Sequence, residues 1–343
     1  MSEDKQLIHP TPAVNVATAK QLLRTYWQKD VPAYLWGPPG VAKSSAIKQV
    51  ASEAKVGFID IRLGTKLPED LTGIPVPNLE KKIAEWLKAE FWPDAERDGK
   101  RGIMLFDEMS DTTRAIQSCA YQVILDRRLG TFELPKGWWP CAAGNRRQDK
   151  AAAQTLSTAL ANRFAHIDVM CTATEWYEWG IENGIDPMVL GFIKQFPDKL
   201  HSMDGADLRA FATPRSWEMA SKFCDSPDNL RLRLIAGCVG EGPALEFNNF
   251  FKTVDLPSFE DILRNPVTCP IPSSPASKYA LSSMIARYLD RANFDKALKY
   301  MMRPEFGREF GICAVLNATK RDVSLIETKA YTTWALANRD IRL

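Results

Sequence analysis

The chain has 343 residues, of which 45% are hydrophobic and 25% charged, and its 44 Lys and Arg nearly balance its 42 Asp and Glu. This length allows two domains, and the composition is that of a folded globular protein rather than a disordered or collagen-like one. A net charge of only +2 gives the chain no overall attraction to nucleic acid or anionic membranes, although a local basic patch would still allow it.

Cysteine usage, hydropathy and the N-terminus bear on the cellular compartment. The seven Cys form no CxxC pair and only three His are present, so we expect reduced thiols and no zinc site. No apolar run reaches the roughly 20 residues that a membrane span needs. The N-terminal MSEDKQLIHP also lacks the apolar segment of a signal peptide. We therefore predict a soluble cytoplasmic protein without membrane contact.

The first half of the chain alternates short apolar runs with amphipathic stretches, which is the pattern of a parallel sheet covered by helices. Five buried strands are predicted, at residues 31–36, 57–63, 102–106, 139–144 and 164–170. Helices are predicted before the first strand, from Ser44 onward, from an N-cap at about Asp111, and up to about Asn162. We therefore predict an α/β fold with a doubly wound, parallel, five-stranded sheet over residues 1–170.

Two insertions interrupt this predicted core, and a helical region follows it. Residues 64–101 are too long for a simple connection, and residues 127–138 predict a hairpin. Beyond the core, helix-spaced apolar faces separated by Pro, Gly or Asp predict a helical domain at about 171–255. After it comes a helical C-terminal segment, residues 256–343, which contains the Pro-rich break 266–275.

The motif GPPGVAKS, from Gly37 to Ser44, lies between a predicted strand and a predicted helix, as a phosphate-binding loop requires. Its glycines let backbone N–H groups surround a phosphate, and the helix N-terminus adds the positive end of its dipole. Lys43 would reach the β- and γ-phosphates of ATP, and the Ser44 hydroxyl would bind Mg²⁺. Ala42 replaces the usual third Gly, at a cost of about 1 kcal/mol if φ must be positive there. The residues predicted to bind ATP are Gly37, Pro38, Pro39, Gly40, Val41, Ala42, Lys43, Ser44 and Ser45.

A Gly/Pro turn with an unrelated Lys is the alternative to a phosphate-binding loop, and the flanking strand and helix disfavour it. A second motif, IMLFDE at 103–108, ends a predicted strand in two acids. Asp107 can hold Mg²⁺ through water, and Glu108 can polarise a water that attacks the γ-phosphate. Acids after a strand are also common N-caps, so this pair alone would be weak evidence for catalysis. Its occurrence together with the predicted phosphate-binding loop makes the evidence strong. Together the two motifs predict hydrolysis of ATP by water.

Four motifs in this order, GPPGVAKS, LFDE, AAGNRR and TPRSW, resemble those of the AAA+ ATPases, and within them the MoxR-like and dynein-related branch. The resemblance covers about residues 30–225. It implies a P-loop core, with residues 171–255 as an α-helical lid, while residues 256–343 match no segment of known role.

The same resemblance implies roles for three further residues. Asn145 corresponds to sensor 1, which helps to position the attacking water. Arg163, in ALANRF, corresponds to the arginine finger, which acts in trans on the nucleotide of a neighbouring subunit. Arg215, in TPRSW, corresponds to sensor 2, a lid arginine that reaches the γ-phosphate. Other arginines that could act in trans are Arg128, Arg146 and Arg147.

Aromatic residues of the first insertion have two interpretations. The resemblance implies that the insertion faces a pore or a partner, with Trp86, Phe91 and Trp92 as candidate contacts. The alternative, which we favour, is that these rings pack the insertion onto its own core. His166 alternates with apolar neighbours in a predicted strand, so we expect a hydrogen-bonded histidine in the core.

The resemblance implies an Mg²⁺-dependent ATPase that assembles into a ring, with six subunits as the expected number, and remodels a partner protein. In this branch that partner often carries a von Willebrand factor A domain. A nucleic-acid motor or loader is one alternative, and the near-neutral charge argues against it. An ATP-gated scaffold with little turnover is another, and the Asp107–Glu108 pair argues against that.

Overall fold

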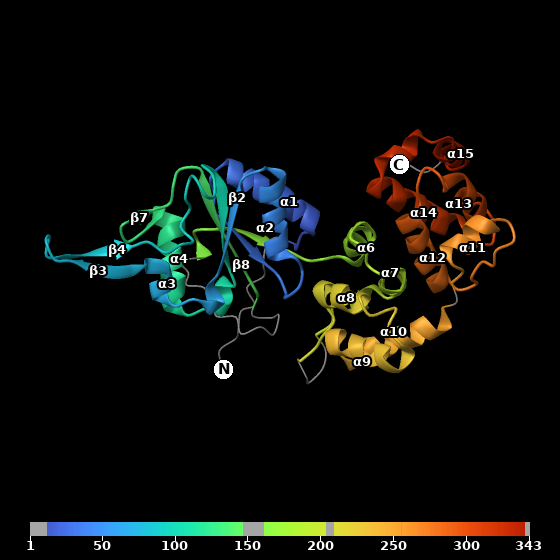
Figure 1. Cartoon of the computed structure of the whole chain (residues 1–343), viewed down its shortest axis with the longest axis horizontal. Coiled ribbons are helices and arrows are strands. Elements are labelled where there is room, and N and C mark those ends of the chain that lie inside the picture. Colours follow the sequence, from blue (N-terminus) through green and yellow to red (C-terminus); the bar gives the residue numbers. More distant parts are fainter. Residues whose placement is uncertain (1–11, 147–160, 204–208, 255, 340–343) are drawn as a thin grey trace, which may run out of the picture. The chain divides into compact units, whose positions relative to one another are not determined.

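The computed structural model describes residues 12–146, 161–203, 209–254 and 256–339. The chain forms two compact units, Met1–Cys171 and Thr172–Leu343 (Figure 1). Among the described residues, none of the helices has both the length and the apolar character needed to cross a bilayer.

The first unit is built on a five-stranded sheet in which all neighbouring strands are parallel. In spatial order the strands are β2 (Gly57–Arg62), β5 (Gly102–Asp107), β8 (Trp138–Gly144), β1 (Ala33–Trp36) and β9 (Ala165–Asp168). Every residue of β5 and β8 is buried, as expected for central strands covered on both faces. The predicted doubly wound, parallel, five-stranded sheet is therefore confirmed.

Helices cover both faces of this sheet. The described helices are α1 (Val16–Gln28), α2 (Lys43–Glu53), the short α3 (Pro68–Thr72) and α4 (Arg114–Asp126). Alternate residues of β1 point to opposite faces, so that Leu35 packs with Leu23 of α1 and Ile47 of α2. Tyr34 packs on the other face, in the cluster that contains Ile116 of α4. Because both faces of the strand are buried, successive residues are apolar, which explains why short apolar runs predicted these strands correctly.

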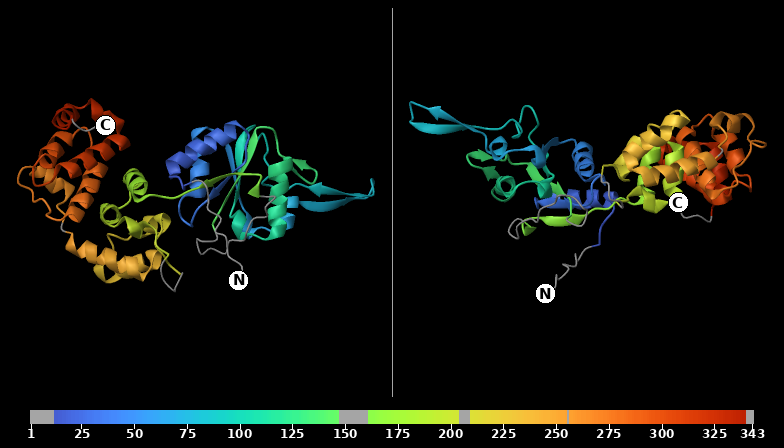
Figure 2. Two further views of the ribbon diagram at one scale, coloured as in Figure 1. Left: turned by 180° about the vertical axis from the view of Figure 1, so that it is seen from behind. Right: turned by 90° about the horizontal axis from the view of Figure 1, so that it is seen from below.

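The first insertion contains an antiparallel hairpin of β3 (Ile74–Asn78) and β4 (Ile83–Leu87), which extends away from the sheet (Figures 1 and 2). Apart from the half-buried Asn78, every residue of both strands is exposed. Trp92 is buried, however, and Phe91 packs against the same core, as the favoured interpretation expected for these two rings. Trp86 of β4 is 44% exposed, so that interpretation is wrong for this ring.

The second insertion forms the predicted hairpin, with β6 (Arg128–Leu129) paired to β7 (Phe132–Glu133). Two local predictions in this unit are wrong. Thr113 rather than Asp111 caps α4, because Asp111 ends a 3₁₀ turn, η2 (Met109–Asp111), that precedes the helix. His166 is exposed on the edge strand β9, although Trp36 Nε1 donates to its Nδ1 at 2.8 Å and its Nε2 lies 2.8 Å from the Ala161 carbonyl oxygen.

The second unit is helical throughout its described secondary structure, apart from one isolated bridge between Ser202 and Ala212. Its α-helices are α6 (Ala173–Glu182), α7 (Pro187–Gln195), α8 (Pro214–Ser221), α9 (Asp228–Val239), α10 (Glu241–Thr253), α11 (Phe259–Arg264), α12 (Pro275–Tyr288), α13 (Phe294–Met301), α14 (Arg308–Arg321) and α15 (Lys329–Ala337). Buried rings of α7, α8 and α10 pack against one another, with Phe192 at the centre, next to Trp217 and Phe247.

Helices α7 and α12 make a close crossing inside this unit. A Cβ atom added at Gly191 of α7 would lie 2.6 Å from Cβ of Ala280 in α12, so the two backbones approach closely. Nearby, the hydroxyls of Tyr177 and Ser283 lie 2.8 Å apart in the buried interior. The predicted division at about residue 255 separates α7 from α12, which pack together, and it stays a prediction.

We expect Gly191→Ala to lower the free energy of unfolding by about 1–3 kcal/mol, because the new methyl group has no room against Ala280. Urea denaturation measures this change. Gly237→Ala is the matched control, since this glycine lies in the helix α9 with open space around it. The control should gain about 0.5–1 kcal/mol, and equal effects of the two substitutions would contradict the close crossing.

Candidate active site

The loop that joins β1 to α2 carries the GPPGVAKS motif, and its backbone explains why small residues occupy it. A Cβ atom added at Gly37 would lie 2.6 Å from the carbonyl oxygen of Val169, which only glycine tolerates. Gly40 has φ 80°. Ala42, the N-cap of α2, has φ 67° and ψ 25°. The position that the third glycine of the motif usually occupies therefore does adopt the left-handed conformation. Val41 is buried and Ser45 is exposed on the first turn of α2.

Lys43 is the first residue of α2, and its side chain is only 8% exposed. Its ammonium donates to the carbonyl oxygens of Gly37 at 2.6 Å and Pro38 at 3.0 Å. It also donates to Oδ1 of Asn145, at 2.9 Å. Burying an ammonium costs free energy unless it has such acceptors. These bonds therefore hold the Lys43 ammonium against the first residues of the loop.

Ser44 and Asp107 join the loop to the end of β5. The Ser44 hydroxyl donates to Oδ2 of Asp107 at 2.5 Å, and the backbone N–H of Glu108 donates to Oδ1 of the same carboxylate at 2.9 Å. Asp107 is the last residue of β5 and is 9% exposed. A hydroxyl and a carboxylate are hard oxygen ligands, which Mg²⁺ prefers together with phosphate oxygens.

Glu108 directly follows β5 and takes a strained backbone conformation, with φ 57° and ψ 30°. Its side chain is exposed. A Cβ atom added at Gly64 would lie 2.7 Å from Glu108 Oε2, so the carboxylate rests against the 3₁₀ turn η1 (Leu63–Thr65). The two predicted acids therefore differ, since Asp107 is buried and bonded while Glu108 is accessible to a water molecule.

Asn145 follows the last residue of β8, and its side-chain oxygen, side-chain nitrogen and backbone N–H all bond within the site. Oδ1 accepts from Lys43, Nδ2 donates to Oδ2 of Asp111 at 2.8 Å, and the backbone N–H donates to Oγ of Ser110 at 2.8 Å. Both Ser110 and Asp111 belong to the turn η2, which sequence reasoning did not connect with the site. The only sign of them in the sequence is that two polar residues, Ser110 and Asp111, follow shortly after Asp107 and Glu108. Nothing in the sequence indicates that they bond to Asn145.

Negative charge is concentrated around Asp107. The pKa of Asp60, on the neighbouring strand β2, is raised by burial and further by the charges of Asp107 and Glu108. Burial likewise raises the pKa of Asp111, against the hydrogen bonds from Asn145 and Ser110. A site in which carboxylates repel one another in this way fits a divalent cation held by Ser44 and Asp107.

The predicted arginines are not gathered at the loop within the first unit. Arg163 is exposed in the turn before β9, and Arg128 is exposed on β6. Arg146 Nη1 lies 3.6 Å from Asp168 Oδ1 of the same chain. Arg147 lies outside the described residues, and Arg215 is exposed in the first turn of α8 in the second unit. The predicted roles of Arg163 and Arg215 stay predictions.

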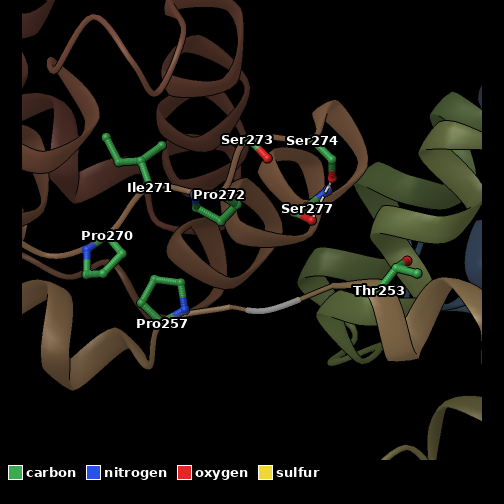
Figure 3. A pocket seen from close by; sticks show the side chains of 8 residues that line it. All are labelled: Thr253, Pro257, Pro270, Ile271, Pro272, Ser273, Ser274 and Ser277. Carbon is green, nitrogen blue, oxygen red and sulfur yellow. Dashed lines mark hydrogen bonds between the residues drawn. The ribbon is translucent and has the colours of Figure 1, made fainter.

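A hollow lies in the helical unit, between the end of α10 and the start of α12 (Figure 3). It is lined by Thr253, Pro257, Pro270, Ile271, Pro272, Ser273, Ser274 and Ser277. None of these described lining residues is charged, and the hydroxyl of Ser274 is already bonded to that of Ser277, at 2.7 Å. The hollow therefore holds no acid or base for catalysis.

Comparison with known families finds a match in the first unit. Residues 33–168 match the family model described as "ATPase family associated with various cellular activities (AAA)". The match covers less than half of the chain and includes the loop, Asp107, Glu108 and Asn145, so this segment is similar to the AAA ATPase domains.

Several solved structures are similar to the chain at low identity. A suspected ATPase from Cytophaga hutchinsonii is 15% identical over 95% of this chain and 89% of its own, with a TM-score of 0.35. The RuvB Holliday junction branch migration motor of Thermotoga maritima is 16% identical over 94% of this chain and 86% of its own, with a TM-score of 0.34. NtrX from Brucella abortus, solved with ATP, is 14% identical over 94% of this chain and 67% of its own, with a TM-score of 0.33. No curated protein matches the chain.

We expect Ala42→Gly to raise the free energy of unfolding by about 0.5–1 kcal/mol, because glycine adopts positive φ without the steric cost that alanine bears. Chemical denaturation checks the change. Ala54→Gly, at the other end of α2, is the control, since Ala54 has φ −82° and its replacement should not stabilise the protein. A loss of stability in Ala42→Gly would show that the left-handed conformation is not strained.

Proposed function

We propose that this protein is an Mg²⁺-dependent ATPase whose reaction takes place at the loop 37–44. The contact between Ser44 and Asp107 at 2.5 Å carries the proposal, because it places a hydroxyl and a carboxylate together beside a phosphate-binding loop. The match of this segment to the AAA family supports the same reading. ATP is the substrate, with water as the nucleophile.

The residues of the loop bind the phosphates of ATP. Backbone N–H groups at the start of α2 face the phosphates, and Lys43 exchanges its carbonyl acceptors for phosphate oxygens. Ser44 and Asp107 are the residues that would hold Mg²⁺, with Asp107 acting through a water molecule. When bound, the ion neutralises charge on the β- and γ-phosphates.

Glu108 and Asn145 act on the attacking water. The exposed carboxylate of Glu108 orients the water and takes its proton, while the water oxygen bonds to the γ-phosphorus and the bond to the bridging oxygen of ADP breaks. Asn145 lies within hydrogen-bond distance of Lys43 and so faces the same phosphate. The products are ADP and inorganic phosphate.

We further propose that subunits form a ring, with six as the expected number, in which Arg163 of one subunit completes the site of its neighbour. An exposed arginine is available for such a contact, and its charge would stabilise the transition state. Arg215 of the helical unit would act as the arginine of the lid and couple hydrolysis to movement. The motif order of the MoxR-like branch supports these assignments.

The hairpin β3–β4 is the element that we propose to contact a partner protein. Its strands are exposed, and the exposed residues include large apolar ones: Ile74 is 65% exposed, Ile83 52% and Trp86 44%. Apolar side chains exposed together often mark a protein interface. The likeness to the MoxR-like branch favours a partner that contains a von Willebrand factor A domain.

The first test measures ATPase rate against protein concentration. Specific activity should rise with concentration in the native chain, and Arg163→Ala should lower kcat by about 10³-fold or more while ATP still binds. Glu108→Gln is the hydrolysis-dead control, and Arg233→Ala, an exposed arginine of α9, is the matched control that should keep full activity. A flat rate per subunit with a silent Arg163→Ala would overturn the shared site.

The second test concerns the partner. With ATP and the Glu108→Gln subunit, a pull-down should recover a protein with a von Willebrand factor A domain. Adding Trp86→Ala should weaken this capture by roughly tenfold, as loss of an aromatic anchor does. Leu336→Ala, at an exposed apolar residue of α15, should leave it unchanged. Recovery of no such protein, or salt-dependent binding to DNA instead, would count against this partner.

A further inference from the structure

The side-chain amide of Asn145 can face the reacting phosphate in two ways, with its oxygen or with its nitrogen. We propose that Asp111 and Ser110 are positioning residues that present the oxygen, Oδ1, to the reaction. This inference rests on the proposed ATPase function and adds two residues to the site. It also defines Asn145 as an acceptor toward the attacking water rather than as a donor toward the phosphate.

The partners of Asn145 determine the orientation of its amide. Oδ1 lies 2.9 Å from the ammonium of Lys43, and Nδ2 lies 2.8 Å from Oδ2 of Asp111. An ammonium can only donate hydrogen bonds, and an ionised carboxylate can only accept them. The reversed amide would set its NH₂ group against the ammonium and its oxygen against the carboxylate, so both contacts would become repulsive.

The turn η2 is held firmly enough to serve as a support. Ser110 is fully buried, and its hydroxyl oxygen accepts from the backbone N–H of Asn145 at 2.8 Å. Gln117, itself buried in α4, donates from Nε2 to the carbonyl oxygen of Met109 at 3.0 Å. The N–H of Asp111 donates to the carbonyl oxygen of Glu108 at 2.9 Å. Hydrogen bonds therefore connect the turn η2 to the helix α4 and to the backbone of Glu108.

Gly144 allows this turn to approach the end of β8. A Cβ atom added at Gly144 would lie 2.7 Å from Oγ of Ser110 and 2.1 Å from the hydroxyl of Tyr34. Only glycine leaves room for Ser110 to reach the backbone N–H of Asn145. The end of β8 thus fixes the backbone of Asn145 through Ser110, and Asp111 fixes its side chain.

The consequence for the reaction follows from the hydrogen bonds of water. When Lys43 turns to the phosphates, the contact with Asp111 keeps Nδ2 occupied and leaves Oδ1 directed at the site. An attacking water has two O–H groups to place, and two acceptors, Glu108 and Asn145 Oδ1, can receive them. The lone pair of the water oxygen is then free to bond to phosphorus.

The test removes and then exchanges the two partners. In Asp111→Ala we expect kcat to fall by about 10- to 100-fold, with a much smaller change in KM for ATP, because binding survives while the acceptor loses its direction. Asn145→Asp should also be slow, because two carboxylates then face each other. Combining Asn145→Asp with Asp111→Asn restores a donor opposite an acceptor, so kcat should recover above both single variants.

A charge control separates hydrogen bonding from simple charge compensation. Asn145→Asp combined with Asp60→Asn removes a carboxylate that interacts with Asp107 and Glu108 but does not restore the donor, so kcat should not recover. Equal recovery in the two double variants would overturn the proposal. So would an Asp111→Ala variant as fast as the native chain, or an Asn145→Asp/Asp111→Asn variant as slow as Asn145→Asp alone.

A second readout needs no turnover. In protein labelled with ¹⁵N-asparagine, the Asn145 side-chain NH₂ signal, assigned by its absence in Asn145→Asp, should exchange slowly in the native chain and faster in Asp111→Ala. Unchanged exchange would overturn the proposal. Thermal unfolding checks that each variant folds. If Asp111→Ala does not fold, Asp111→Asn and Ser110→Ala replace it in both measurements. A native chain without ATPase activity would instead refute the proposed function.

Discussion

The buried ammonium of Lys43 is the group on which the geometry of the site depends. A charge that is 8% exposed requires acceptors, and these come from two places, the loop carbonyls of Gly37 and Pro38 and the amide of Asn145. The first two lie at the end of β1 and the third at the end of β8. Parallel pairing of β1 with β8 brings these ends to one edge of the sheet. The order of the strands therefore supplies the acceptors that the buried ammonium needs.

The acidic side of the site follows from the next pairing in the same sheet. β5 lies beside β8, and its last residue, Asp107, reaches the hydroxyl of Ser44 at the start of α2. Asp60 on β2 adds a carboxylate whose pKa is raised by burial and by the charge of Asp107. Lysine and acids therefore occupy one edge of the sheet, where a phosphate bound with a divalent cation would balance both charges.

The molecule separates residues that stabilise it from residues that remain available for contact. Aromatic rings of the second unit, such as Phe192 and Trp217, fill its interior, and the close crossing of α7 and α12 requires glycine at position 191. The hairpin β3–β4 instead exposes its apolar side chains, although a two-stranded hairpin gains little stability by itself. The first insertion contains one tryptophan of each kind, since Trp92 is buried and Trp86 is exposed.

The sequence by itself determined the five strands of the central sheet, the glycine-containing loop 37–44 and the helical second half, because apolar periodicity and glycine placement are local properties. It also predicted strain at Ala42 if φ were positive there, and the structure gives φ 67°. Only the tertiary structure decided that Asp111 bonds to Asn145 instead of capping α4, that His166 is exposed on an edge strand, and that Trp86 is exposed. The contact between Asp111 and Asn145 joins residues 34 positions apart. Such contacts depend on which strands lie side by side, and a local pattern carries no information about that order.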